Sequence, residues 1–317
     1  MNQVAAILNS LVIYRYSLIL ALAGAAGVCI FMACCSHARL PGSQAAACAV
    51  TAVILSLPLA RLLYWYGRPD SFASFSQAMT TKTTESFALA GAFGGCFLSA
   101  MITGARGKRK IILDCMSVAG CVSIALGRLG SFFTETDRGQ VMTQLTGLPW
   151  AYPVMNTAGQ MEYRFATFLF QAAVAAMLAV FLGVVFIHKH RSGEITVLFL
   201  LVYSASQVIL DSTRYDSLYL RSNGFVSMVQ IFAAVTLAFT LVILSIQSVK
   251  ILGRKKWMIP LWFSLSVLFA GAGYMEYYVQ RHGRQAAFAY SVMGGCLICI
   301  VGLGLLLWKL SRSSADQ

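Results

Sequence analysis

The sequence predicts an all-α polytopic membrane protein, and three observations support this fold class. Of the 317 residues, 58% are hydrophobic and only 11% are charged, whereas soluble domains carry about 25% charged residues. Apolar stretches of about 20 residues, the length that crosses a bilayer as a helix, recur along the whole chain. Basic residues are concentrated in the short connections between these stretches, as membrane topology requires.

Nine apolar stretches are predicted to span the membrane. The first, over 17–36, has no charged residue, and the second, over 44–65, carries one arginine near its end. The third, over 86–104, is rich in glycine, and the fourth, over 111–127, lies between the basic run "GKRK" and Arg128. The remaining five are apolar runs at residues 165–187, 194–211, 226–249, 257–278 and 287–308.

The basic residues predict an orientation for these spans. With the N-terminus outside, the inner connections contain the dense runs "GARGKRK" at 104–110 and "KILGRKK" at 250–256. The C-terminus is then cytoplasmic. The net charge of +13 is explained by these loops, so we expect no nucleic-acid partner. The start "MNQVAAILNS" lacks the basic region and cleavage site of a signal peptide, so we expect none.

The nine cysteines do not predict a metal or redox site. All of them lie in or beside apolar stretches, where thiols behave as small apolar side chains. Cys296 and Cys299 have the spacing of a redox or zinc motif, but no histidine or charge lies near them in the sequence. We therefore expect neither a metal nor another cofactor.

Four arginines lie at predicted outer ends of helices. They are Arg61, Arg128, Arg164 and Arg214. One interpretation is that they are interfacial anchors whose charged groups reach the membrane surface. The other is that they hold phosphate, which arginine contacts with two parallel hydrogen bonds. The outer segment 128–164 is the longest connection, and a loop of that length is usually functional.

The segment "GRLGSFFTETDRG", residues 127–139, follows the fourth predicted helix. It resembles the signature Gly-Arg-x-Gly-Asn-Phe-x-Asn-x-Glu-x-x-Gly of the prolipoprotein diacylglyceryl transferases. The similarity covers roughly residues 10–250 and includes the segments "VIYRYSLILALAG", "ARLLYWYG", "GAFGGCFLSA", "RFATFLFQA" and "DSTRYD". The resemblance implies a seven-helix core over 1–250, and residues 251–317 then form an extension of two helices and a short tail.

The resemblance also implies an activity. Members of the family move diacylglycerol from phosphatidylglycerol to the lipobox cysteine of lipoprotein precursors, at the outer face of the bacterial inner membrane, and glycerol phosphate leaves. By position in the motifs, the expected catalytic residues are Arg128, Arg214, Tyr16 and Asp211. The expected substrate-binding residues are Arg61, Gly94, Gly95, Gly130, Ser131, Thr134, Glu135, Gly139 and Gln230.

Several positions depart from the family pattern. Phe93 replaces the histidine before Gly-Gly, and Ser131 and Thr134 replace the two signature asparagines. Thr136 replaces the signature glutamate, with Glu135 beside it. Deprotonation of the thiol would then depend on one of four residues, namely Asp211, Glu135, Asp137 or Tyr16.

These departures leave a second hypothesis open. The protein would be a catalytically silent relative that binds anionic phospholipid or a lipoprotein precursor. A third hypothesis, a transporter, is disfavoured because no pair of acids within the membrane marks an ion path.

Overall fold

A computed structural model describes residues 4–8, 11–80, 87–134, 137–142, 150–156, 158–188, 190–219, 226–252, 256–282 and 285–313. The chain forms two compact units. Unit 1 comprises Met1–Thr196 together with Thr213–Arg221, and unit 2 comprises Val197–Ser212 together with Ser222–Gln317. The expected all-α polytopic architecture is confirmed, and two short hairpins are added to it.

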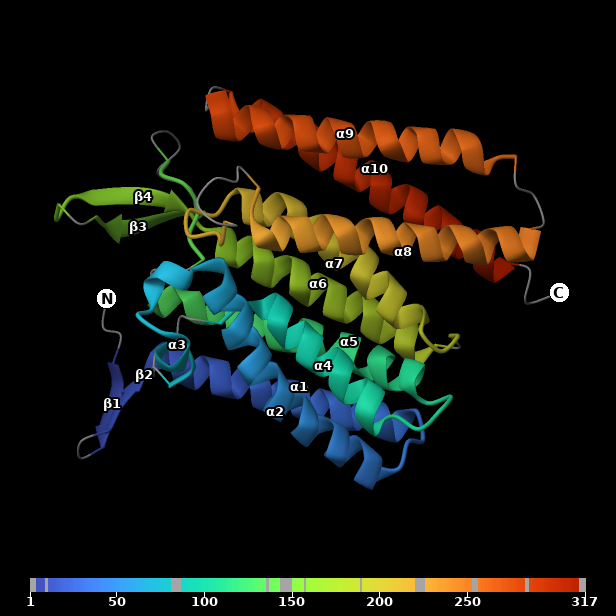
Figure 1. Ribbon diagram of the computed structural model, residues 1–317, viewed down its shortest axis with the longest axis horizontal. Coiled ribbons are helices and arrows are strands. Elements are labelled where there is room, and N and C mark those ends of the chain that lie inside the picture. The colour runs from blue at the N-terminus through green and yellow to red at the C-terminus, as the bar shows by residue number, and fades with distance from the viewer. Residues whose placement is uncertain are drawn as a thin grey trace. The chain divides into compact units, whose positions relative to one another are not determined.

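Unit 1 is built from five long helices. They are α1 (Arg15–His37), α2 (Gly42–Gly67), α4 (Leu89–Thr103), α5 (Arg109–Leu129) and α6 (Thr167–Ile187). Helix α2 packs on α4, α1 packs on α5, and α5 packs on α6, as Figure 1 shows. Short helical turns connect them: η1 (Pro69–Ser71), α3 (Phe75–Thr80) and η2 (Gly130–Phe133).

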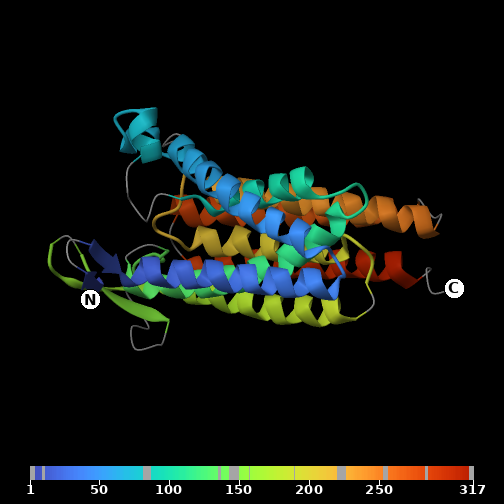
Figure 2. The same cartoon turned by 90° about the horizontal axis from the view of Figure 1, so that it is seen from below.

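Two antiparallel hairpins project from one end of unit 1. One consists of β1 (Val4–Leu8) and β2 (Leu11–Tyr14), and the other of β3 (Ala151–Met155) and β4 (Met161–Phe165). Both lie at the end where α1 begins and α5 ends (Figures 1 and 2). At the tip of the second hairpin, Met155 and Met161 are cross-strand partners and are 63% and 64% exposed. The long outer segment expected over 128–164 therefore contains this hairpin.

The contact between α2 and α4 depends on glycine. Gly91 and Gly95 are four residues apart, so they lie on one face of α4. A Cβ atom at Gly91 would lie 2.3 Å from the Leu59 carbonyl oxygen, and one at Gly95 would lie 2.4 Å from the Ser56 Cα atom. The two backbones approach closely because small residues face each other, as is common between membrane helices.

Unit 2 contains four helical segments. They are the part of α7 (Glu194–Ser212) from Val197 onward, α8 (Met228–Leu252), α9 (Met258–His282) and α10 (Ala286–Ser313). Helix α10 packs against both α8 and α9. The buried core takes side chains from all four segments, including Leu201, Leu237, Leu241, Leu265, Met293 and Ile300. The last two helices thus share one apolar core with α7 and α8.

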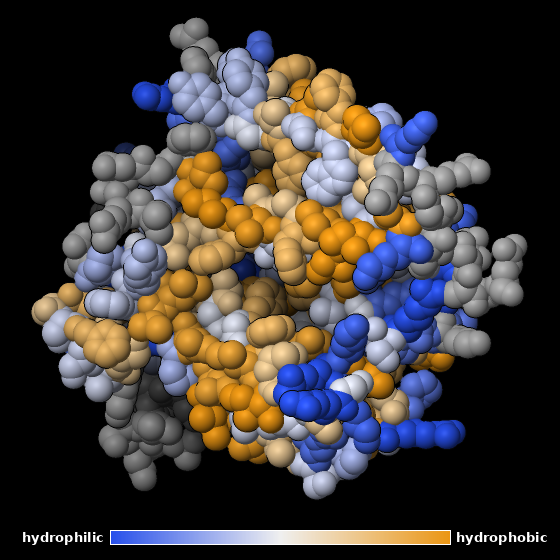
Figure 3. Space-filling view, turned by 45° about the vertical axis from the view of Figure 1, so that its right-hand side comes forward, coloured by the Kyte–Doolittle hydropathy of each residue, from blue (hydrophilic) through white to orange (hydrophobic). Residues whose placement is uncertain are grey.

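Eight helices within the described residues are long and apolar enough to cross a membrane. The third of the nine predicted spans is shorter than expected, because α4 has 15 residues and a full crossing needs about 20. Many large apolar side chains on the long helices are exposed, including Val180, Ile187, Ile259 and Ile298. Figure 3 shows hydrophobic side chains gathered in broad patches on the face it presents. Such patches suit contact with lipid, because a soluble surface rarely leaves so much apolar area uncovered.

Candidate functional site

Two of the predicted arginines meet at one carboxylate in unit 1. Arg128 lies in the last turn of α5, and its Nη1 atom is 2.5 Å from Oδ1 of Asp137. Arg214 follows the end of α7, and its Nη2 atom is 2.8 Å from the same oxygen. The side chains of Arg128 and Arg214 are 15% and 14% exposed. We call Arg128, Asp137 and Arg214 the arginine cluster.

Gly139 brings the segments of this cluster together. Its N–H donates to the Phe165 carbonyl at 2.7 Å, and it forms an isolated antiparallel bridge with Arg214. A Cβ atom at Gly139 would lie 2.7 Å from the Phe165 Cβ atom. Only glycine therefore fits where the chain after α5, the end of β4 and the chain after α7 meet.

Several hydrogen bonds and ion pairs fix the position of Asp137. Its backbone has a φ of 60°, in the left-handed region, which costs a non-glycine residue free energy. The Ser131 hydroxyl donates to Oδ2 at 2.9 Å, and the Asp137 N–H donates to Oδ2 of Asp216 at 3.0 Å. Burial would raise the pKa of the Asp137 carboxyl. The charges of Arg128 and Arg214 and the hydrogen bonds outweigh burial and hold this pKa well below its usual range.

The surroundings of the cluster carry excess positive charge. Arg214 Nε donates to Oδ1 of Asp216 at 3.0 Å, and Arg68 Nη2 donates to the Asp216 carbonyl at 3.1 Å. Buried Arg138 lies 4.1 Å over the Tyr152 ring and donates to the Thr134 carbonyl at 3.1 Å. The group as a whole contains four arginines and two aspartates and has a net charge of +2; its members are Arg68, Arg128, Arg138, Arg214, Asp137 and Asp216. Such a group attracts an anionic ligand.

Tyr16 and Gly130 adjoin the cluster. Gly130 begins η2 directly after α5, and a Cβ atom there would lie 3.1 Å from Cδ2 of Tyr16. The Tyr16 ring therefore lies against the backbone of the signature segment. Ser131 and Thr134 are both buried in this segment. The Ser131 hydroxyl donates to Asp137, and the Thr134 backbone carbonyl accepts from Arg138.

Three predicted residues belong to the α2–α4 region of unit 1. The Nε of Arg61 donates to the Ala78 carbonyl at 2.5 Å, and the guanidinium lies over the Phe72 and Phe87 rings. Gly95 is in the helix contact described above. Gly94 instead lines an apolar groove of about 310 Å³, together with Leu59, Leu62, Leu63, Trp65, Tyr66 and Gly91.

Asp211 and Gln230 belong to unit 2, where both interact with Ser227. The Ser227 hydroxyl donates to Asp211. The Gln230 N–H donates to this hydroxyl at 3.1 Å, and the Ser227 N–H donates to the Gln230 amide oxygen at 2.9 Å. This reciprocal pair is a capping box at the start of α8. The Gln230 amide nitrogen donates to the Val208 carbonyl at 3.0 Å, so both ends of its side chain are engaged within the unit.

The sequence did not predict every residue around the arginine cluster. Glu135 and Thr136 lie outside the described residues. The sequence predicted Asp137 only as a candidate base, and it did not predict Arg138 or Asp216 as site residues. The available signal was the run "TDRG" at 136–139, where an acid stands one residue after the position of the family glutamate. Within the described ranges, no group of three or more metal-ligating side chains is found.

The fold and the arginine cluster together define a polytopic α-helical membrane protein with a positively charged site at one end of its helices. Residues 3–246 match the family described as prolipoprotein diacylglyceryl transferase. The chain belongs to this family of transferases.

Two named relatives are similar to the chain. A phosphatidylglycerol–prolipoprotein diacylglyceryl transferase of Acaryochloris marina is 25% identical over 221 residues, which cover 67% of this chain and 79% of the relative. A protein of the same name from Streptococcus equi subsp. zooepidemicus is 29% identical over 134 residues, which cover 40% of this chain and 51% of the relative.

Proposed function

We propose that the protein transfers diacylglycerol from phosphatidylglycerol to the lipobox cysteine of lipoprotein precursors at the outer face of the bacterial inner membrane. The observation that carries the proposal is the arginine cluster. It is formed by the family's signature segment and by the segment after α7, and it retains Arg128 and Arg214 side by side. Its net positive charge suits a phosphodiester headgroup.

In this reaction one bond forms and one breaks. The cysteine sulfur bonds to the terminal glycerol carbon of the diacylglycerol part, and the bond from that carbon to the phosphate oxygen breaks. Glycerol phosphate leaves with the electron pair, and the thiol proton passes to a base or to solvent. Negative charge on the phosphate grows as the bond breaks, so prepositioned guanidinium groups stabilise the transition state more than the bound lipid.

Asp137 is proposed to position the two arginines. Its shared oxygen fixes both guanidinium groups before the lipid arrives, which lowers the cost of ordering them on binding. Its lowered pKa makes it a weak base, so we do not assign it the thiol proton. Tyr16, Asp211 and Glu135 remain the proposed candidates for that role, and Arg61 and Gly94 remain proposed lipid contacts.

We further propose the orientation and organisation expected from the sequence. The N-terminus and the β3–β4 hairpin lie outside, and the C-terminus is cytoplasmic, because the dense basic runs "GARGKRK" and "KILGRKK" then lie inside. Residues 1–250 form the transferase core, and residues 251–317 form its extension. The partners are phosphatidylglycerol, lipoprotein precursors and membrane lipids.

One observation favours the second hypothesis, a silent lipid-binding relative. Phe93 in α4 stands where the family pattern has histidine, and a phenyl ring cannot transfer a proton. The Ser131 hydroxyl donates to Asp137, so it does not replace the missing base.

A rescue experiment separates the two functions. The gene is expressed in a bacterial strain depleted of its own transferase, and a model lipoprotein is analysed by mass spectrometry. Growth together with a diacylglyceryl adduct on the lipobox cysteine would support transfer. Unmodified precursor, with the protein expressed and inserted at normal levels, would contradict transfer and support the silent relative.

A further inference from the structure

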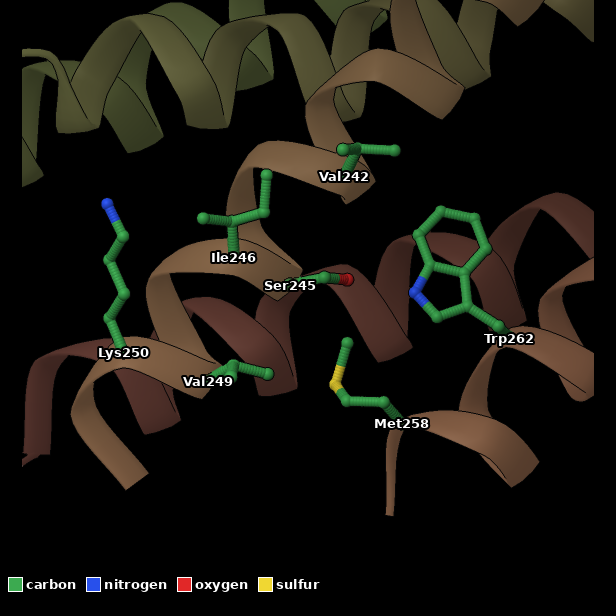
Figure 4. A pocket seen from close by; sticks show the side chains of 7 residues that line it. All are labelled: Val242, Ser245, Ile246, Val249, Lys250, Met258 and Trp262. Atoms are coloured by element: carbon green, nitrogen blue, oxygen red, sulfur yellow. The ribbon is translucent and has the colours of Figure 1, made fainter. Parts of the chain in front are cut away.

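A second candidate site lies in unit 2, away from the arginine cluster in sequence. An apolar groove of about 640 Å³ runs between the end of α8 and the start of α9. This volume is within the range of about 300–1,000 Å³ that small-molecule sites occupy. Its lining residues are Val242, Ser245, Ile246, Val249, Lys250, Met258 and Trp262 (Figure 4). The family match ends at residue 246, and four of the seven lining residues, Val249, Lys250, Met258 and Trp262, lie beyond it.

Polar groups converge inside this apolar groove. Ser245 is 4% exposed, and its hydroxyl oxygen is buried without a hydrogen-bond partner among the described residues. Figure 4 shows this hydroxyl and the indole nitrogen of Trp262 pointing toward one another across the groove. The indole N–H donates and the serine hydroxyl can both donate and accept, and a buried hydroxyl without a partner is unfavourable. An ester or phosphate oxygen of a ligand could accept a hydrogen bond from the Ser245 hydroxyl.

The charged side chain of Lys250 lies at one end of the groove. Exposed Lys250 is five residues after Ser245 on α8, which places it about 7.5 Å further along the helix axis. Lys256 is exposed just before α9. The Ser248 hydroxyl donates to the Leu307 carbonyl of α10 at 3.0 Å, so the ends of α8 and α10 lie together. Lys309 and Arg312 belong to that end of α10, and this end of unit 2 is strongly basic.

We propose that the groove binds one anionic phospholipid of the cytoplasmic leaflet. An acyl chain lies along Val242, Ile246 and Trp262, an ester carbonyl accepts from Ser245, and the headgroup phosphate contacts Lys250. The occupant is a phospholipid because the walls include exposed apolar side chains of membrane-spanning helices, so lipid is what meets them. It is anionic because basic pockets at the cytoplasmic ends of helices select such headgroups. The proposal rests on the proposed orientation and not on the transferase activity.

Fluorescence quenching tests the site directly. Of the five tryptophans, Trp65, Trp150, Trp257 and Trp308 are replaced by phenylalanine, which leaves Trp262. The protein is reconstituted into phosphatidylcholine vesicles that contain increasing amounts of phosphatidylglycerol or phosphatidylcholine with brominated acyl chains, which quench a tryptophan that they touch. We expect brominated phosphatidylglycerol to reach half-maximal quenching at about one fifth of the amount that brominated phosphatidylcholine requires. The reason is that one lysine near the headgroups contributes about 1 kcal/mol.

Matched variants assign the preference to the groove. Lys250→Gln should abolish the preference for phosphatidylglycerol, while Lys309→Gln, an exposed lysine on α10 that does not line the groove, should retain it. Ser245→Leu should fill the groove and reduce quenching by both lipids. Equal quenching by the two lipids, or a preference that survives Lys250→Gln, would overturn the proposal. If the phenylalanine variant does not fold, native mass spectrometry of the Lys250→Gln and Lys309→Gln proteins measures the same difference as retained phosphatidylglycerol.

Discussion

At the scale of single residues, Asp137 determines how the arginine cluster is built. It is 7% exposed, and one of its oxygens contacts both Arg128 and Arg214. Two guanidinium groups at this separation would repel each other without it. The sequence predicted the two arginines from their position at helix ends and from the family motif. It could not predict their common partner, because that contact depends on how the segment after α5 meets the segment after α7.

Asp137→Asn should destabilise the protein by about 3–5 kcal/mol, since it leaves two buried cations without their carboxylate. The pKa of Asp137 is lowered in the folded state, so its contribution to stability is present above the unfolded pKa of about 3.9 and is lost as the pH falls below that value. Thermal unfolding in detergent from pH 8 to pH 3 measures this. The difference between wild type and variant should be constant down to about pH 5 and should shrink below about pH 4. If the stability difference between wild type and variant already disappears at pH 6, the arginines do not lower the pKa of Asp137.

Arg128→Lys should lower the transfer rate by about 10²–10³, the effect of losing one transition-state donor. Lysine keeps the charge but cannot make two parallel hydrogen bonds to phosphate or carboxylate. The measurement is transfer from phosphatidylglycerol to a model lipoprotein peptide, together with phosphatidylglycerol binding. Arg281→Lys, at an exposed position near the end of α9, is the control. If both variants behave alike at equal expression, Arg128 is an interfacial anchor.

At the scale of elements, the glycines of α4 have two different surroundings. Some lie in the contact with α2, and one faces open space. Gly91 and Gly95 face α2, whereas Gly94 has no atom within 4 Å of an added Cβ. The sequence placed Gly94 and Gly95 together as lipid-binding residues because the family motif contains both. Which face of α4 each glycine occupies follows from the crossing of the two helices, and no pattern within one helix specifies that crossing.

Gly95→Ala should destabilise the protein by about 1–3 kcal/mol, because its methyl group meets the α2 backbone, which cannot give way easily. Gly94→Ala should leave stability unchanged or raise it by up to about 1 kcal/mol, because alanine favours the helix and space is open. The two adjacent substitutions have the same chemistry, so they are matched controls for one another. Unfolding temperatures in detergent measure both, and equal effects would contradict the close crossing.

The elements themselves were predicted unevenly. Helix positions were predicted well because a bilayer demands long apolar runs, and this signal is local. The β3–β4 hairpin was not predicted, since its strands are five residues each and lie in a long mixed segment. The predicted third span, 86–104, is longer than α4 by Ser86, Phe87 and Ala88 at its start and by Gly104 at its end, because a sequence sets helix ends only to within a few residues.

At the scale of the whole molecule, the proposed orientation places both hairpins and the arginine cluster outside. It rests on the density of basic residues in the short connections, since lysine and arginine are retained on the cytoplasmic side. Within unit 1, Gly107 lies between α4 and α5, and Gln140 lies just past the arginine cluster. Both residues are exposed, so a label attached at either position would report on which side of the membrane it lies.

Cysteine introduced at position 140 should react with a membrane-impermeant maleimide in intact cells, and cysteine introduced at position 107 should not. Lysed cells should label at both positions, which shows that each site is accessible. The parent protein without either substitution gives the background from the nine native cysteines. Labelling at 107 but not at 140 in intact cells would invert the topology and exclude the arginine cluster from the outer face.

The exposed tip of the β3–β4 hairpin has a consequence for oxidation chemistry. Met155 and Met161 carry two thioethers on paired positions of adjacent strands, and methionine is readily converted to its sulfoxide by peroxide. Buried methionines such as Met228 and Met293 are protected from the same reagent. Met177 is equally exposed, at 65%, but lies on the apolar helix α6. Among the described methionines outside the long apolar helices, a brief exposure of cells to oxidant would therefore mark this tip first. A docked precursor that covered the hairpin would be visible as lost sulfoxide at these two positions, without any label added to the protein.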